Sequence, residues 1–544
     1  MKNSASETSF YVESDEEDAE REIQNEGNDS DYSIDSNENH PQRKPSSYSM
    51  QWPQSYRQSI DLYGSVPSPS IGFLGTPSLS RLGSSFVSST LIRRQHTAEK
   101  LPPVKKPLLQ PEADEKQRRS SHGLLPPLVS RKSSIRKEKD ASKVCHEIEF
   151  AGQCTFGQAV LNGINALCGV GILSIPYAVR EGGWVGIGIL LMFAVFSFYT
   201  GLLLRYCLDS EPGLETYPDI GQAAFGTTGR IAISIILYSE LYACCIEYII
   251  LESDNLSSLF PDAHLSLGGI ELNAHILFAL FATLAILPTV WLRDLRILSY
   301  ISAGGVIASI VVVLCLFWVG LLDNVAIPSQ RSTLNLATLP VAMGLYGYCY
   351  SGHAVFPNLY TAMANRNQFP AVLLTCFVIC TAMYVGVAVV GYLMFGDGTL
   401  SQYTLNMPQS LVATKIAMWT TVVNPFTKYA LSMAPVALCM EELIPSNDRK
   451  FYVYSILIRT ALVFSTLLVG LLIPFFGLVM SLIGSLLTMF VTLIIPCACF
   501  LSIWRGRVSR LQVAFCITIM TVGIAASVIG SYSAISEIIE SLRG

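Results

Sequence analysis

Charged residues are scarce in this sequence, and they are unevenly placed. Asp, Glu, Lys and Arg make up only 14% of the 544 residues, whereas hydrophobic residues make up 51%. Of the 36 Lys and Arg residues, 20 precede Cys145, so the long remainder of the chain carries few cations. This composition indicates a polytopic membrane protein with a soluble N-terminal arm.

Motifs for enzyme chemistry are also missing. The 14 cysteines are scattered mostly through apolar runs. The close pairs Cys376 with Cys380 and Cys497 with Cys499 have no His or second Cys pair at zinc-ligand spacing. We interpret the cysteines as small packing residues and expect no metal and no cofactor. Without a nucleophile motif or phosphate loop we expect no enzyme, and we expect no nucleic acid partner.

Residues 1–150 form an arm that we expect to be disordered and cytosolic. The arm is acidic up to Glu38 and then basic and Ser-rich up to Lys143, with few large apolar groups. It has no charged stretch followed by an apolar core, so we expect no cleavable signal peptide. Several serines beside Arg and Lys suit basophilic kinases, although an unregulated solvated tail is the alternative. These phosphorylation candidates are Ser120, Ser121, Ser133 and Ser134.

Residues 151–544 contain eleven apolar segments of the length that a membrane-spanning helix needs, about 20 residues. They are residues 156–178, 184–207, 230–251, 274–292, 297–321, 336–362, 371–395, 410–440, 451–474, 477–503 and 512–535. Basic residues concentrate in alternate loops, which by the positive-inside rule makes those loops and the arm cytosolic. The basic loops hold Arg205, Arg230, Arg293, Arg296, Arg366, Arg449, Lys450, Arg505, Arg507 and Arg510. An odd number of spans places the C-terminus on the opposite side.

Glycine and proline interrupt the first and the sixth span. Gly171 precedes Pro176 by the same interval that separates Gly352 from Pro357. Unwound backbone persists in a membrane only beside protein, water or substrate, because lipid cannot satisfy its N–H and C=O groups. A single break is equally explained by a kink in a packed helix. Two breaks five spans apart predict an inverted repeat of five plus five helices with a binding site between the breaks.

The two breaks suit a ligand with adjacent opposite charges. A half-helix starting near Ile172 would direct its N–H groups at a carboxylate. Carbonyl groups freed in residues 167–169 and 349–351 would receive an ammonium group, which suggests an α-amino acid. Amides of the first half-helix could bind substrate or simply join helices. The substrate-binding candidates are Asn165, Gly169, Val170, Gly171, Ile172, Tyr348, Cys349, Tyr350, Ser351 and Gly352.

Four stretches resemble the amino acid/auxin permease family. They are TFGQAVLNGINALCGVGILSIPYAVREGGW in the first span, YSGHAVFPNLY in the sixth, MFGDGT after the seventh and NPFTKYAL in the eighth. The arm and the eleven spans are similar to plant vacuolar amino acid transporters, relatives of the vesicular inhibitory amino acid transporter. The resemblance implies a LeuT-type fold with repeats at about 156–321 and 336–503 and an extra helix at about 512–535. It also implies proton-coupled movement of neutral amino acids across the vacuolar membrane.

Three ionisable residues inside the spans are candidates for proton coupling, because charges in a bilayer are costly and mark functional sites. Glu240, on one helical face with Glu247, could carry the proton or serve as a structural partner. Lys428 could place its ammonium group at the unwound first span, where sodium binds in sodium-coupled relatives, or extend to the cytosolic interface. His353, beside the second break, could relay a proton or make a structural hydrogen bond.

We therefore expect a secondary transporter of neutral amino acids that uses protons, by antiport into the vacuole, with the C-terminus in the lumen. Symport would drive export instead, and the sequence leaves the direction open. Two alternatives stay open as well. One is a plasma-membrane permease for amino acids or auxin. The other is a membrane sensor of amino acids whose transport is vestigial and whose arm docks a kinase or another regulatory partner.

Overall fold

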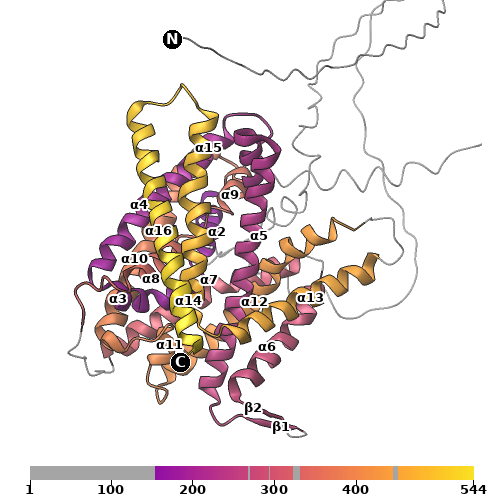
Figure 1. Cartoon of the computed structure of the whole chain (residues 1–544), viewed down its shortest axis with the longest axis vertical. Helices are drawn as coiled ribbons and strands as arrows, with labels where there is room; N and C mark the ends of the chain where they lie inside the picture. The colour runs from indigo at the N-terminus through magenta and orange to yellow at the C-terminus, as the bar shows by residue number, and fades with distance from the viewer. Residues whose placement is uncertain (1–153, 268–269, 293–294, 323–330, 445–450, 544) are drawn as a thin grey trace, which may run out of the picture. The chain divides into compact units, whose positions relative to one another are not determined.

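The structure, a computed structural model, describes residues 154–267, 270–292, 295–322, 331–444 and 451–543. The N-terminal arm and its four candidate phosphorylation serines lie outside these residues. Within the described ranges the chain is almost entirely helical (Figure 1).

Helices cover each of the eleven predicted segments. The unbroken ones are α4 (Val185–Leu208), α5 (Tyr217–Leu259), α6 (Ala274–Trp291), α7 (Leu295–Leu322), α10 (Phe369–Phe395), α12 (Val412–Glu441), α13 (Phe451–Leu472) and α16 (Arg510–Arg543). In the described part of the chain, seven helical segments are long and apolar enough to cross a membrane on their own, and one bent pair makes an eighth. The chain is therefore a multi-pass, all-helical membrane protein, as predicted.

Three of the predicted segments contain more than one helix. The first consists of α2 (Phe156–Leu167), the 3₁₀ helix η2 (Val170–Ser174) and α3 (Ile175–Gly182), and the sixth of α8 (Leu339–Cys349) and α9 (Phe356–Ala362). The tenth consists of α14 (Phe476–Ile483), the π-helical turns η5 (Gly484–Thr488) and η6 (Phe490–Ile494), and α15 (Ile495–Ile503). The π-helical turns are a departure that the sequence did not predict.

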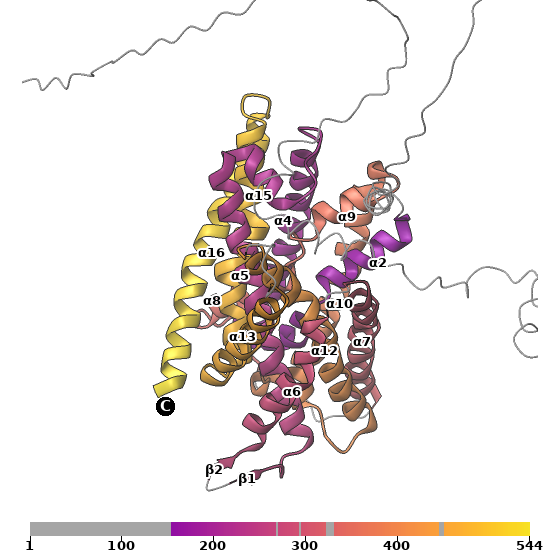
Figure 2. The ribbon, with the colours of Figure 1, turned by 90° about the vertical axis from the view of Figure 1, so that its right-hand side faces the viewer.

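Several short elements join the spans. They are the strands β1 (Leu265–Leu267) and β2 (Ile270–Leu272), the 3₁₀ turns η3 (Arg366–Gln368) and η4 (Gly396–Gly398), and α11 (Tyr403–Asn406). The antiparallel hairpin of β1 and β2 pairs Leu265 with Leu272 and was not predicted, because strands of three residues leave no clear alternating pattern. The hairpin and the C-terminal end of α16 lie at one end of the bundle, and the turn between α15 and α16 lies at the other (Figures 1 and 2). We call the first of these the hairpin end.

Local signals explain where the helices begin. Thr155 caps α2 in a capping box with Gln158, and Thr216 caps α5 in the same way with Asp219. These caps satisfy N–H groups that have no partner within the helix. Gly226 has a φ of 68° and marks a kink in α5 just before the predicted third span. Only glycine adopts this conformation at low cost, which explains the kink.

Close helix packing positions the broken segments. α12 packs against α7 and α5, while α3 and α16 both pack against α8. A Cβ atom on Gly484 would overlap the carbonyl oxygen of Gly344, and one on Gly344 would overlap the carbonyl oxygen of Ser481. Small residues let the backbones of α8 and of the tenth segment approach within van der Waals contact.

Candidate functional site

The first break lies at Cys168 and Gly169, between α2 and η2, and bends the segment by 50°. We predicted a half-helix from Ile172, but the α-helix begins at Ile175 and a 3₁₀ helix precedes it. The reason is Pro176, which has no N–H to donate to the Ile172 carbonyl, so a regular α-helical turn cannot form through this point.

The second break has the same construction. α8 ends at Cys349, the chain passes through two tight turns, and α9 begins at Phe356. Pro357 is the second residue of α9, just as Pro176 is the second residue of α3. Proline is tolerated there, because the N–H groups of a helix's first turn have no intrahelical acceptor. Each proline therefore marks the point where its helix resumes.

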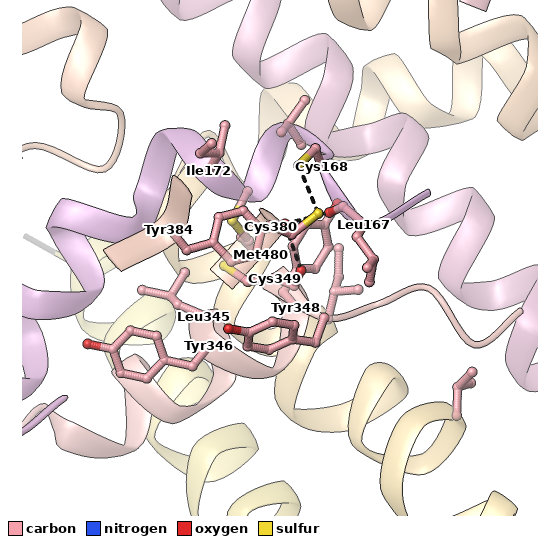
Figure 3. Packing of buried hydrophobic residues seen from close by; sticks show 14 of the residues in the cluster. Leu167, Cys168, Ile172, Leu345, Tyr346, Tyr348, Cys349, Cys380, Tyr384 and Met480 are labelled. Atoms are coloured by element: carbon pink, nitrogen blue, oxygen red, sulfur yellow. Dashed lines mark hydrogen bonds between the residues drawn. The ribbon is translucent and has the colours of Figure 1, made fainter. Parts of the chain in front are cut away.

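The two breaks contact each other directly (Figure 3). A Cβ atom on Gly171 would lie 3.1 Å from the ring of Tyr348. A Cβ atom on Gly352 would lie 2.9 Å from the side chain of Leu167. The Cys349 thiol lies 3.8 Å from the Gly171 carbonyl oxygen. Glycine at both breaks is what allows this approach, and it brings most of the predicted substrate-binding residues together.

Tyr384 of α10 connects the two breaks, a role that sequence reasoning missed. Its hydroxyl lies 2.7 Å from the Leu167 carbonyl oxygen and 3.1 Å from that of Cys349, and its single proton serves both (Figure 3). We predicted that these carbonyl groups would be free for an ammonium group, but they already have a donor. The neighbouring thiol of Cys168 donates a hydrogen bond to Cys380 at 3.3 Å, and the two form no disulfide, in keeping with cysteines as packing residues.

Lys428 of α12 points into the bundle toward the first break. Its side chain is buried, and its Nζ atom donates to the Cys168 carbonyl oxygen at 3.5 Å. The Ser309 hydroxyl of α7 reaches the same oxygen at 3.5 Å, and Asn424 donates to that hydroxyl at 3.4 Å. No carboxylate in the described part of the chain forms an ion pair with Lys428. In this conformation the Lys428 side chain therefore extends to the first break.

Glu240 of α5 joins the second break to the tenth segment. Its Oε1 atom accepts hydrogen bonds from Ser351 at 2.8 Å and from Thr488 at 2.7 Å, and the side chain is buried. Thr488 ends the π-helical turn η5, where one extra residue per turn re-aims side chains. Sequence reasoning missed Thr488, because a π-helical turn in an apolar span leaves no signal in the residue pattern.

His353 lies apart from the other two coupling candidates. Its Nε2 atom is 2.9 Å from the Thr200 hydroxyl and 3.1 Å from the Ser197 carbonyl oxygen, both on α4. Its ring packs against Phe356 at a centroid distance of 4.9 Å. No hydrogen bond joins His353 to Glu240 or Lys428 among the described residues. In this structure His353 therefore makes hydrogen bonds of the structural kind, one of the two roles that the sequence allowed.

Two substrate-binding candidates have different surroundings. The Tyr350 hydroxyl turns to α10, where it is 3.1 Å from the Thr381 hydroxyl, and its ring stacks on Phe377. Only the backbone of Tyr350 is left to serve the site. Asn165, on the last turns of α2, is half-buried, and its Oδ1 atom is buried without a hydrogen-bond partner. An orphaned buried oxygen of this kind is a ready acceptor for a ligand donor.

A small cavity adjoins the first break on the side away from α8. Its volume is about 10 Å³, room for roughly a single water molecule. It is lined by Gly169, Val170, Ile172, Leu173, Leu251, Ser309, Val312, Thr421 and Asn424. An amino acid does not fit in this space.

A buried ion pair in the ninth span was also missed. Arg459 of α13 donates to Glu441 of α12 at 2.7 Å and to the Val290 carbonyl oxygen of α6 at 2.8 Å. Glu441 also accepts a hydrogen bond from Ser455. The charge of Arg459 is thereby compensated within the bundle, so this residue ties three helices together and does not face the breaks.

Comparisons with known proteins agree with the sequence motifs. Residues 152–536 match the family model described as "Transmembrane amino acid transporter protein". The chain is 67% identical to the Arabidopsis thaliana "Amino acid transporter AVT1C", over the full length of both chains. It is 26% identical to the "Vesicular GABA transporter" of Caenorhabditis elegans, covering 76% of this chain and 85% of that protein.

The fold was also compared with solved structures. The crystal structure of MhsT in complex with L-phenylalanine aligns with a TM-score of 0.42 and 12% identity, covering 69% of this chain and 98% of that one. The family match confirms the resemblance stated from the motifs and the prediction that the chain is not an enzyme. This multi-pass membrane protein belongs to the family of transmembrane amino acid transporters.

Proposed function

We propose that this chain is a proton-coupled secondary transporter of neutral α-amino acids that works by alternating access. The observation that carries the proposal is the direct contact between two helix breaks, each attached to one buried ionisable side chain. Lys428 reaches the first break through the Cys168 carbonyl, and Glu240 reaches the second through Ser351. Membership of an amino acid transporter family supplies the substrate class.

The substrate carboxylate is expected at the start of η2. The N–H groups of Val170 and Gly171 open this helix and have no acceptor within it, which makes them donors for an anion. The substrate ammonium is expected at the Leu167 and Cys349 carbonyl groups, where it takes the place of the Tyr384 hydroxyl. The backbone thus offers N–H groups to a carboxylate and carbonyl groups to an ammonium group. All α-amino acids carry both of these groups.

Replacing Tyr384 by Phe tests this placement. Without substrate the variant leaves the buried Cys349 carbonyl group without the Tyr384 donor and the Leu167 carbonyl group with only the Gly169 N–H, which costs about 1–3 kcal/mol. With substrate bound, the ammonium group satisfies them, so the loss is smaller. We expect the melting temperature in detergent to fall, and the increase in melting temperature on adding substrate to be larger than in the wild type. Equal destabilisation with and without substrate would place the ammonium elsewhere.

The fold proposed for residues 156–535 is the LeuT type, with two inverted repeats of five helices at about 156–321 and 336–503 and an extra helix at about 512–535. The support is internal: both breaks lie in the first helix of a repeat, and both resumed helices carry proline as their second residue. An odd number of helices per repeat inverts the second repeat in the membrane, which lets the two breaks meet at mid-depth.

We further propose a vacuolar membrane location, a cytosolic N-terminus and antiport of protons against amino acids. The sequence resemblance to plant vacuolar transporters and the distribution of basic loops support these points. Expression of a tagged copy in plant cells tests the location, and labelling at the vacuolar membrane is expected. Labelling at the plasma membrane would favour the permease alternative. Phosphorylation of the arm stays a prediction from its sequence.

Transport itself is tested with the purified protein in proteoliposomes. Radiolabelled uptake is measured over a panel of amino acids, with and without a pH gradient, while a trapped dye reports internal pH. We expect uptake of neutral amino acids that depends on the gradient. Binding without any gradient-dependent uptake would favour the sensor alternative.

The site is tested in the same assay with Gly171→Leu. A leucine side chain there collides with Tyr348, because even its Cβ atom would lie 3.1 Å from the ring. We expect substrate affinity to fall by at least about tenfold, because one overpacked contact costs about 1–3 kcal/mol. Gly188→Leu is the matched control, since no atom lies within 4 Å of its Cβ position. Normal affinity in Gly171→Leu would remove the break from the binding site.

A further inference from the structure

One face of α5 carries a row of acidic residues that reaches beyond Glu240. Glu240, Glu247 and Asp254 follow one another at intervals of seven residues. A helix turns by about 700° over seven residues, so successive members drift by only about 20° and stay on one face. Each interval rises about 10.5 Å along the helix, so the row leads from the second break toward the hairpin end of the bundle.

Glu247 is the unusual member of this row. Its side chain is fully buried, and its carboxylate oxygens make no regular hydrogen bond, although the Tyr348 side chain interacts with them. A carboxylate with so little hydrogen bonding is costly to bury in an apolar interior. Tyr348 of α8 faces the carboxylate, and its hydroxyl lies 3.5 Å from the thiol of Cys244. Nothing in the proposed substrate site explains why an acid is buried here.

Asp254 connects the row to the surface at the hairpin end. Its Oδ1 atom lies 3.2 Å from Nε2 of His275, at the start of α6. Its Oδ2 atom accepts a hydrogen bond from Gln402 at 2.8 Å. The side chains of Asp254 and His275 are 20% and 28% exposed, so water reaches both residues. Imidazole groups serve as proton shuttles in proteins.

We propose that this face of α5 conducts protons between the hairpin end of the membrane protein and Glu240. Protons enter at Asp254 and His275, and Glu247 binds them between the entry point and Glu240. The inference rests on the proposed function. In each step a carboxylic acid gives its proton to the Tyr348 hydroxyl or an intervening water, which passes its own proton to the next carboxylate, so two O–H bonds break and two form. Among the described residues, the titratable groups that face the row are Tyr348 from α8, His275 from α6 and Cys244 on α5 itself, while Tyr248 of α5 faces Tyr348.

The same helix provides a matched control. Glu252 is also buried, and its oxygens have no hydrogen-bond partner. It lies five residues after Glu247, about 140° around the helix, and interacts with Tyr429 of α12 instead. Replacing Glu252 tests whether the loss of any buried carboxylate on α5 affects transport, or whether only the loss of a carboxylate on the proposed path does.

The experiment compares wild type, Glu247→Gln, Glu247→Asp, Glu252→Gln and His275→Gln in proteoliposomes loaded with a pH-sensitive dye. Two rates are measured: amino acid exchange at equal pH on both sides, and proton flux driven by an amino acid gradient. We expect Glu247→Gln to retain exchange and to lose at least about tenfold in proton flux, the size of a lost acid-base group. Glu247→Asp should recover much of the flux, and Glu252→Gln should match the wild type. His275→Gln should weaken the dependence of proton flux on the pH at the hairpin end.

The outcomes separate the two proposals. Wild-type proton flux in Glu247→Gln, or equal losses in Glu247→Gln and Glu252→Gln, would overturn the path and leave the transport function intact. Absence of both exchange and proton flux in the wild type would overturn the transport function and the path together. If Glu247→Gln does not fold, an unchanged pH dependence of proton flux in His275→Gln would also refute the path.

Discussion

Replacing Glu240 by Gln is expected to separate amino acid movement from the proton gradient. The amide oxygen of Gln accepts the same hydrogen bonds from Ser351 and Thr488 that the carboxylate accepts at 2.8 and 2.7 Å. The side chain also keeps its volume, so packing between α5, the second break and η5 is preserved. What the variant loses is the ability to bind and release a proton between these three elements.

We expect Glu240→Gln to exchange amino acids across the membrane at a rate near that of the wild type. Uptake driven by a pH gradient should fall by at least about tenfold, and its pH dependence should flatten. Dye-reported proton flux and labelled uptake in proteoliposomes provide the measurement. Thr488→Val is the control, because it removes one hydrogen bond and leaves the titratable group in place. Unchanged gradient-driven uptake in Glu240→Gln would assign proton coupling to another residue.

Replacing Lys428 by Met is expected to impair transport at the first break. The ammonium group is buried and donates to the Cys168 carbonyl oxygen, where the helix has no backbone donor to offer. Methionine has a similar length but no donor and no charge. A hydrogen bond from a charged group contributes about 1.5–3 kcal/mol, so we expect substrate affinity or rate to fall by about ten- to a hundredfold.

Sodium provides a second measurement for this variant. If the ammonium group of Lys428 occupies the place that sodium fills in sodium-coupled transporters, Lys428→Met should regain part of its activity when sodium is added. Lys415→Met is the matched control, because Lys415 lies on the same helix but is exposed. Wild-type transport in Lys428→Met, or an equal loss in Lys415→Met, would show that the buried ammonium group does not support the break.

The broken helices show how far the sequence pattern reaches. Gly171 with Pro176 and Gly352 with Pro357 marked both breaks, because proline and glycine act on their own backbone whatever surrounds them. The start of the resumed helix was placed near Ile172, whereas the α-helix begins at Ile175 after a 3₁₀ turn. The ends of a helix depend on which neighbouring groups donate and accept hydrogen bonds. A sequence therefore predicts that a helix exists better than it predicts where the helix ends.

The partners of the site residues were harder to predict. Glu240 and Lys428 stood out because an ionisable group in an apolar span is rare. Tyr384 and Thr488 did not, since hydroxyl side chains are common in membrane helices and carry no charge. His353 was predicted either to relay a proton or to make a structural hydrogen bond, and its hydrogen-bond partners lie on α4. Most of these pairings join residues more than a hundred positions apart, and all depend on how the helices pack.

The sequence by itself determined the class of this protein, the number of apolar segments, the location of the two breaks and the ionisable residues inside the membrane. Each of these follows from local chemistry: the length of an apolar run, a missing N–H, or a charge that lipid does not solvate. Only the tertiary structure decided that the breaks touch, that Tyr384 serves both, and that Glu240 and Lys428 attach to different breaks. These features arise because buried backbone and side-chain polar groups take whichever partners the packed helices bring within hydrogen-bond distance.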